Sequence, residues 1–114
     1  MSTLREDIFN TVDIEREIVH VWGKDIEVRT MSGAGRADYL AGATDESGAV
    51  DKKRMYAAVI IETCYVPGTE DKVFKPEDRD AILAKSAKVT GKLFDTALKL
   101  AGLTGDATEK VKNG

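Results

Sequence analysis

Few residues of this chain have the types and neighbours that covalent or acid–base chemistry requires. Cys64 is the only cysteine and His20 is the only histidine. Cys64 stands among apolar residues with no histidine near it in the sequence, and a thiol in such surroundings behaves as a small hydrophobe. His20 lies between Val19 and Val21 in an alternating segment, where a strand-face histidine is expected rather than a general base. A single cysteine also excludes an intrachain disulfide and a cysteine-based metal cluster.

Two other patterns could bind ions, but both lack the necessary spacing. Residues 32–36 (SGAGR) are Gly-rich and end in a cation, yet they lack the Gly-Lys-Ser/Thr ending of a P-loop and the three glycines of a dinucleotide fold. We interpret Ser32 as a helix N-cap instead. The acids between positions 70 and 80 lack the EF-hand order of ligands and are interpreted as solvated turn and helix-start charges. These acids are Glu70, Asp71, Glu77, Asp78 and Asp80. The sequence therefore predicts no enzyme, no cofactor and no metal site.

Composition and charge limit the remaining classes of protein. The chain has 114 residues, 42% of them hydrophobic and 32% charged, which is typical of one globular domain with a modest core. The net charge of −3 lacks the basic excess of a nucleic-acid binder, and we interpret the basic run at 52–54 (KKR) as a solvated helix end. No apolar run approaches the roughly 20 residues of a membrane span, and the N-terminus does not resemble a signal peptide. A cytoplasmic protein without nucleic-acid or membrane partners is expected.

The elements that would position any functional surface begin with a β-hairpin over residues 17–31. Val19 and Val21 alternate with Ile18, His20 and Trp22, and Ile26 and Val28 alternate with polar residues, so each strand is expected to place one face on a core. A turn is predicted at 23–24 (Gly-Lys), because glycine accepts the positive φ of a tight hairpin. The neighbouring tryptophan, at position 22, adds apolar surface to a ribbon that would be marginal alone.

Helices are predicted over most of the remaining chain, which gives a mainly helical α+β fold. Asp51 begins the most apolar helix, which is expected to lie at the centre of the core. Pro67-Gly68 ends it, Pro76 fits a first helical position, and Gly102 fits a left-handed C′ position with Leu103 making the accompanying contact. The predicted helices span 33–42, 51–66, 76–85 and 86–101. We predict a flexible arm at 1–11, a single domain at 12–103 and a flexible tail at 104–114.

A small acidic domain without a reactive constellation is best interpreted as a protein that binds other proteins. The hairpin edges are candidates for strand addition, and the apolar helix stripes are candidates for self-association. Two surfaces are proposed to bind other proteins. They are the hairpin and the residues of the last helix that do not pack in the core. The candidate residues are Trp22, Ile26, Val28, Phe94 and Leu98.

The order of elements over residues 17–103 resembles the tail assembly chaperones of long-tailed, siphovirus-type bacteriophages in their short form. That family shows a WG-type turn, a V-x-V-R strand, an [S/T]-G-A-x-R helix start, an F-x-x-E-D…L-x-x-K-S pattern and an L-F-x-x-A-L-x-L-[S/A]-G-L ending. The chain departs from the pattern at Gly35, where the family commonly has a charged or helix-favouring residue, and glycine inside a helix costs about 1 kcal/mol. The matching segments are 22–23 (WG), 26–29 (IEVR), 32–36 (SGAGR), 74–86 and 93–103.

The resemblance implies a non-catalytic protein that coats the tape measure protein, recruits tail tube subunits and leaves before the virion is complete. It also implies self-association and a location in the host bacterial cytoplasm, with absence from the mature virion. A ribosomal frameshift often extends the short form in that family. Codons for 111–113 (VKN) can contain the slippery heptamer A-AAA-AAC, so we hypothesise such an extension here, and a gene without that heptamer would contradict it.

Two alternatives stay open. A small structural virion protein, such as a head–tail connector or tail terminator subunit, would also be acidic, mixed α/β and oligomeric. Helices 76–85 and 86–101 could also form a DNA-binding helix-turn-helix, but the second offers only Lys88, Lys92 and Lys99 in an acidic chain. Presence in mature particles distinguishes the first alternative, and salt-dependent duplex binding distinguishes the second.

Overall fold

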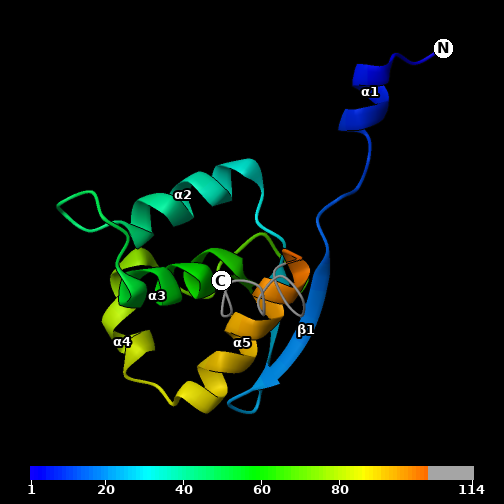
Figure 1. Cartoon of the computed structure of the whole chain (residues 1–114). Coiled ribbons are helices and arrows are strands. Elements are labelled where there is room, and N and C mark those ends of the chain that lie inside the picture. Colours follow the sequence, from blue (N-terminus) through cyan, green and yellow to red (C-terminus); the bar gives the residue numbers. More distant parts are fainter. Residues whose placement is uncertain (103–114) are drawn as a thin grey trace.

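A three-stranded antiparallel sheet packs against helices in the computed structural model, which describes residues 1–102 (Figure 1). The predicted α+β fold, with a hairpin followed by about four helices, is confirmed. The predicted tail at 104–114, the contact of Leu103 and the frameshift segment at 111–113 lie outside the described residues. The elements are α1 (Leu4–Phe9), β1 (Arg16–Val21), β2 (Lys24–Arg29), α2 (Gly33–Ala43), α3 (Lys52–Thr63), β3 (Cys64–Tyr65), the 3-10 turn η1 (Pro76–Asp78), α4 (Arg79–Leu83) and α5 (Ala87–Leu100).

The hairpin turn lies one residue earlier than predicted. Val21 pairs with Lys24, so the two turn residues are Trp22 and Gly23, with φ of 52° and 70°. Positive φ at both central positions is the signature of a type I′ turn, whose twist matches that of the strands. The prediction of a Gly23-Lys24 turn was therefore wrong. The sequence does not favour a turn at Trp22-Gly23, because tryptophan seldom adopts a positive φ. The consequence is that the Trp22 ring stands at the tip of the hairpin, 42% exposed.

Strand β2 is the central strand and is buried on both faces, contrary to the predicted alternation. Ile26 and Val28 lie on the core side as expected, but Glu27 and Arg29 are also buried. The reason is that β3 pairs with β2 and the chain after β3 covers these two polar side chains. Within the described residues β1 is left as an outer strand of the sheet, so it carries the open edge of the hairpin.

Helix α3 is the centre of the core, as predicted, but it is shorter than expected. The Asp51 carboxylate accepts a hydrogen bond of 3.0 Å from the Arg54 N–H and caps the helix. The α3 residue Ile60 is fully buried. The helix ends at Thr63, and the next two residues form β3, where Cys64 pairs with Val28. The prediction of a helix to position 66 followed an apolar periodicity that continues past the true helix end.

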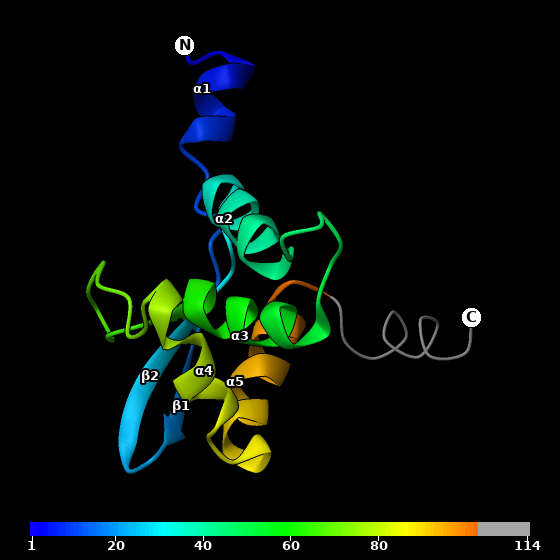
Figure 2. The ribbon, with the colours of Figure 1, turned by 90° about the vertical axis from the view of Figure 1, so that its left-hand side faces the viewer.

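The other helices pack around α3, as Figure 2 shows. Helices α2, α4 and α5 each contact α3, and α5 also contacts β1 and β2. The predicted N-cap at Ser32 is confirmed, since its hydroxyl accepts a hydrogen bond of 3.1 Å from the Gly35 N–H. The helix predicted over 76–85 begins as a 3-10 turn and continues as α4, which ends at Leu83. Gly102 has the predicted left-handed conformation, with a φ of 75°.

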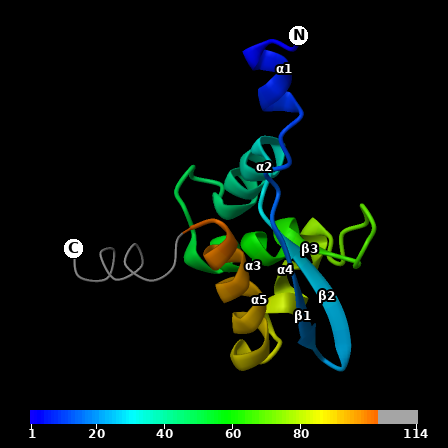
Figure 3. The ribbon, with the colours of Figure 1, turned by 90° about the vertical axis from the view of Figure 1, so that its right-hand side faces the viewer.

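The N-terminal arm contains a short helix, α1, that projects from the body of the molecule. Thr3 caps it by accepting a hydrogen bond from the Glu6 N–H, and no residue of α1 is buried. Figures 1 and 3 show α1 at one end of the molecule and the turn between β1 and β2 at the opposite end. The flexibility of this arm and the domain boundaries at 12 and 103 stay predictions.

Candidate protein-binding groove

An apolar groove of about 540 Å³ lies between the hairpin, the chain that follows β3, and α4. We call it the hairpin groove. Helix α4 and the hairpin both line this groove. Helix α4 contributes Ala81 and Ile82, and charged side chains from the hairpin and the α4 region complete the lining. The remaining apolar lining residues are Trp22, Ile26, Val66, Pro67, Val73 and Phe74.

The wall formed by residues 66–74 is held in place by backbone pairing with the sheet. The Val66 N–H donates to the Asp71 carbonyl at 2.9 Å, and the Val73 N–H donates to the Cys64 carbonyl at 3.1 Å. Gly68 makes the return possible because its φ of 73° is in the left-handed region. These bonds leave the side chains of Val66 and Val73 43% and 36% exposed, which places two unpartnered apolar groups on one wall.

An ion pair with α3 anchors the same loop. The Lys72 ammonium donates to the Glu62 carboxylate at 2.6 Å. Partial burial disfavours the charged form of Lys72, but the hydrogen bond and negative charge of Glu62 outweigh it and raise the pKa of the lysine. The lysine therefore stays charged throughout the neutral range, and the loop stays attached to α3.

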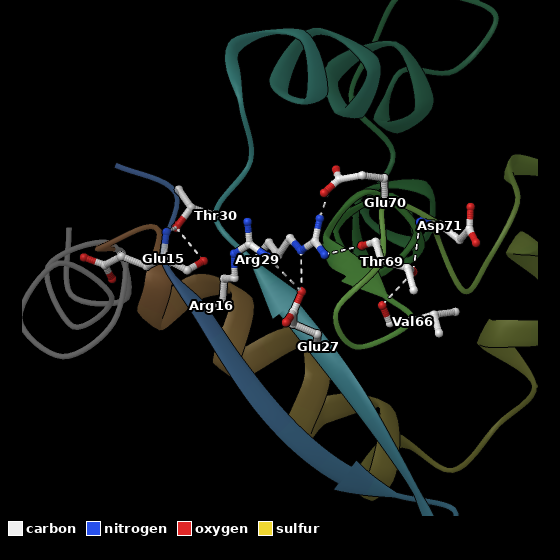
Figure 4. A network of polar contacts seen from close by, with 9 residues as sticks. All are labelled: Glu15, Arg16, Glu27, Arg29, Thr30, Val66, Thr69, Glu70 and Asp71. Atoms are coloured by element: carbon white, nitrogen blue, oxygen red, sulfur yellow. Dashed lines mark hydrogen bonds and ion pairs between the residues drawn. The ribbon is translucent and has the colours of Figure 1, made fainter. Parts of the chain in front are cut away.

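A buried arginine joins the loop to β2 on the sheet face away from the core (Figure 4). The Arg29 guanidinium donates to the Glu27 carboxylate at 2.5 Å and to Glu70 at 3.3 Å, and it also donates to the carbonyl of Thr69. The ring of Tyr65 stacks beneath it, 4.0 Å from the guanidinium carbon. We call this group the Arg29 clamp. It fixes the start of the groove wall relative to the hairpin.

The four charged residues that line the groove differ in their partners. Asp25 lies 2.8 Å from His20, and the Asp78 carboxylate accepts a hydrogen bond of 2.8 Å from the Lys75 N–H. Lys24 and Lys85 form no ion pair with any residue in the 1–102 range. The Asp78 carboxylate likewise forms no ion pair in that range, so the charged lining of the groove consists of two lysines and two aspartates and is balanced in formal charge.

The structure brings together only two of the five residues that the sequence singled out. Trp22 and Ile26 line the hairpin groove, whereas Val28 is fully buried in the core. Phe94 stacks on the ring of Tyr56 with the centroids 4.6 Å apart, so it joins α3 to α5. Leu98 lines a separate cavity of about 320 Å³ between α5 and the start of α2.

Sequence reasoning missed the wall at 66–74 and the α4 side of the groove. A usable signal was present, because the pairs Val66-Pro67 and Val73-Phe74 place four apolar residues in a segment otherwise composed of polar turn residues. Apolar pairs in such a connection need a partner surface. The position of Trp22 directly before the turn glycine was the second signal.

Of the two residues considered first for chemistry, Cys64 is placed where its thiol has little reactivity. Cys64 is fully buried, and this burial raises the pKa of its thiol to about 12. His20 is exposed at the hairpin beside Asp25. Across residues 1–102, no group of three or more histidine, cysteine or acidic side chains could hold a metal ion. In the same range, no helix combines the length and the apolar character needed to cross a membrane.

Comparison with known proteins gives one informative match. No protein-family model matches the sequence, and no curated protein sequence matches it either. Among solved structures, the chain is similar to the bacteriophage HK97 tail assembly chaperone, with a TM-score of 0.53 and 16% sequence identity. The likeness covers 87% of this chain and 99% of that chain. It shows that the two chains share a fold over nearly their whole lengths.

Proposed function

We propose that this protein is a non-catalytic phage tail assembly chaperone that binds the tape measure protein and recruits tail tube subunits while the tail is built. The observation that supports the proposal most is the fold shared with the HK97 tail assembly chaperone over 99% of that chain. The order of sequence motifs from the Trp22-Gly23 turn to the end of α5 supports it independently, since it resembles the same family.

The surface properties fit this role. A long helical tape measure exposes apolar surface before the tube covers it, and many copies of a small protein could shield that surface. The net charge of −3 would discourage the coated complex from aggregating. Avidity across repeated copies would allow each single contact to be weak and therefore removable. The proposal places the protein in the host bacterial cytoplasm and absent from the mature virion.

We place the tape measure contact on α5 around Leu98. Of the five candidate residues, Val28 and Ile26 are buried in the core, although Ile26 also lines the hairpin groove, and Phe94 is engaged with Tyr56. Leu98 instead borders a cavity on the outside of the core, where an apolar side chain from a partner helix could enter. Trp22 lies in the hairpin groove, on a different side of the fold.

Co-expression with the tape measure protein tests this contact. The unchanged chain should co-purify with it, and Leu98→Ser should lower the recovered complex by about tenfold, the effect of losing one buried leucine side chain. The matched control is Leu40→Ser, which changes a leucine of α2 that is 48% exposed and outside both cavities. Equal recovery for the two variants would contradict the placement on α5.

Mass spectrometry of purified mature particles separates this function from that of a structural virion protein. We expect the chain in lysates of cells that assemble tails and not in the finished particles. A fixed number of copies per particle would instead identify a connector or terminator subunit.

A further inference from the structure

Strand β1 has one long edge with which no part of the described chain pairs. The sheet order is β1-β2-β3, so β2 has a neighbour on both sides and β1 on one side only. The opposite end of the sheet is closed by residues 66–73, which fold back onto β3 with a hydrogen bond of 3.1 Å from the Val73 N–H to the Cys64 carbonyl. Across residues 1–102, the free edge of β1 is therefore open to a further strand.

The register of the hairpin identifies the backbone groups on this edge. In an antiparallel ladder, residues that exchange both hydrogen bonds with the partner strand alternate with residues whose N–H and C=O groups point away from it. Val21 and Lys24 flank the two-residue turn and form a bonded pair, so the bonded positions of β1 recur every two residues from there. The bond of 3.0 Å from the Thr30 N–H to the Glu15 carbonyl follows the same alternation. The outward-pointing groups therefore belong to Arg16, Ile18 and His20.

The side chains of these three residues are also exposed. Ile18 is the middle one and is 51% exposed, although it is apolar. Strand β1 contains no proline and pairs with β2 in continuous register over six residues, so it lacks two of the devices that keep edge strands from pairing. The edge thus combines a row of free backbone donors and acceptors with an exposed apolar side chain at its centre.

The spacing of the free groups determines which kind of partner fits the edge. They recur every two residues, about 6.7 Å apart, which matches the repeat of a second extended strand. A helix does not fit, because its own turns use its N–H and C=O groups. The helical tape measure protein is therefore unsuited to this edge, and its proposed contact lies on α5 around Leu98. The tail tube subunit is the other partner in the proposed function.

We infer that a tail tube subunit binds by adding an extended segment to the free edge of β1. The segment pairs with the outward backbone groups of β1, and one of its apolar side chains packs beside Ile18. This inference rests on the proposed function, because it assigns a surface to the recruitment step. The edge and the cavity around Leu98 are separate, so one copy of the chain can hold both partners at once.

Hydrogen exchange tests the pairing at single amides. In the free chain, the amides of Arg16, Ile18 and His20 should exchange about a hundredfold faster than those of Val19 and Val21, which are bonded to β2. In the complex with the tail tube subunit, the three outward amides should slow by at least tenfold. Exchange is quenched, the complex is dissociated, and the amides are read by NMR. Outward amides that exchange as fast in the complex as in the free chain would overturn the inference.

Substitution of Ile18 tests the contact by a second route. Ile18→Pro removes an outward N–H and no bond to β2, so the hairpin should form, since edge strands tolerate proline where the N–H faces solvent. It should lower the recovery of the tail tube subunit in co-purification by about tenfold and leave that of the tape measure protein unchanged. Ile18→Lys keeps every backbone group, places a charge where the added strand packs and should also lower the recovery of the tail tube subunit.

The matched control is Leu40→Lys, which changes an α2 leucine that is 48% exposed. It should bind both partners like the unchanged chain, and circular dichroism verifies that each variant is folded. Undiminished binding of the tail tube subunit by folded Ile18→Lys would overturn the inference and leave the recruitment role intact. A chain that binds the tape measure protein but no tail tube subunit would contradict recruitment as well. Dimers of the purified chain that Ile18→Lys converts to monomers would show that the edge pairs with a second copy, which would also overturn the inference.

Discussion

The guanidinium of Arg29 lies over the ring of Tyr65, 4.0 Å from its centroid, although the two residues belong to different strands. This contact explains how a charged residue is accommodated when its side chain is only 5% exposed. The face of the Tyr65 ring lies against the guanidinium, and the carboxylates of Glu27 and Glu70 balance the positive charge of Arg29. The Arg29 clamp therefore connects the central strand to the loop that forms one wall of the hairpin groove.

Replacement of Arg29 by alanine should lower the free energy of unfolding by about 3 kcal/mol, because it leaves the buried Glu27 carboxylate without its closest partner. Urea unfolding followed by circular dichroism measures this change. Arg16→Ala is the matched control, since the Arg16 guanidinium lies 3.7 Å from the same carboxylate but its side chain is 51% exposed. The control should cost less than about 1 kcal/mol. Equal losses in the two variants would show that the clamp contributes no more than a surface ion pair.

Glu27, Arg29 and Tyr65 show which features of the fold could not be predicted from local sequence patterns. The hairpin, the Ser32 cap and the apolar stripe of α5 follow from periodicity and capping, which are properties of neighbouring residues. The burial of Glu27 and Arg29 depends instead on β3, and β3 exists because Cys64 and Tyr65 find backbone partners on β2. The helical spacing of Tyr56, Ile60 and Cys64 continues one residue past the helix end, so periodicity alone could not locate that boundary.

Two glycines should respond in opposite directions to replacement by alanine. Gly23 has a φ of 70°, which strains any residue with a Cβ, so Gly23→Ala should lower the free energy of unfolding by about 1 kcal/mol. Gly35 lies inside α2, and a Cβ there would meet Ser32 and Met31 at ordinary contact distances of 3.5 and 3.7 Å. Gly35→Ala should therefore raise the free energy of unfolding by about 0.5–1 kcal/mol. Thermal unfolding of the two variants beside the unchanged chain measures both, and a loss of stability in Gly35→Ala would contradict the assigned start of α2.

The Cys64 thiol should be inert in the folded protein and should make stability depend on alkaline pH. Burial raises its pKa from 9.0 to about 12, so the native state keeps the proton that the unfolded state releases above pH 9. The unfolded state then binds fewer protons, and stability falls as the pH rises from 9 towards 12. Cys64→Ala lacks this contribution and should lose less stability over that range in urea titrations. A thiol reagent should react with the unchanged chain only after unfolding, and rapid reaction in the folded state would contradict the burial.

The hairpin groove was only half predictable from the sequence. Trp22 and Ile26 were chosen because they belong to an apolar hairpin that needs a partner. Val28 was chosen for the same reason, yet it is buried in the core. The local sequence pattern does not distinguish an apolar residue that packs inward from one that faces a partner. The other wall, with Phe74 and Ile82, required the tertiary arrangement of α4 beside the hairpin.

The number of copies of this chain bound to one tape measure protein tests the central claim most directly. Co-expression of the two proteins, purification through the tape measure protein and light scattering of the complex would give that number. The account predicts a soluble complex with many copies of the chain along each tape measure polypeptide, because a small domain can shield a long helix only by repetition. A tape measure protein that stays insoluble, or a complex with a single copy of this chain, would contradict it.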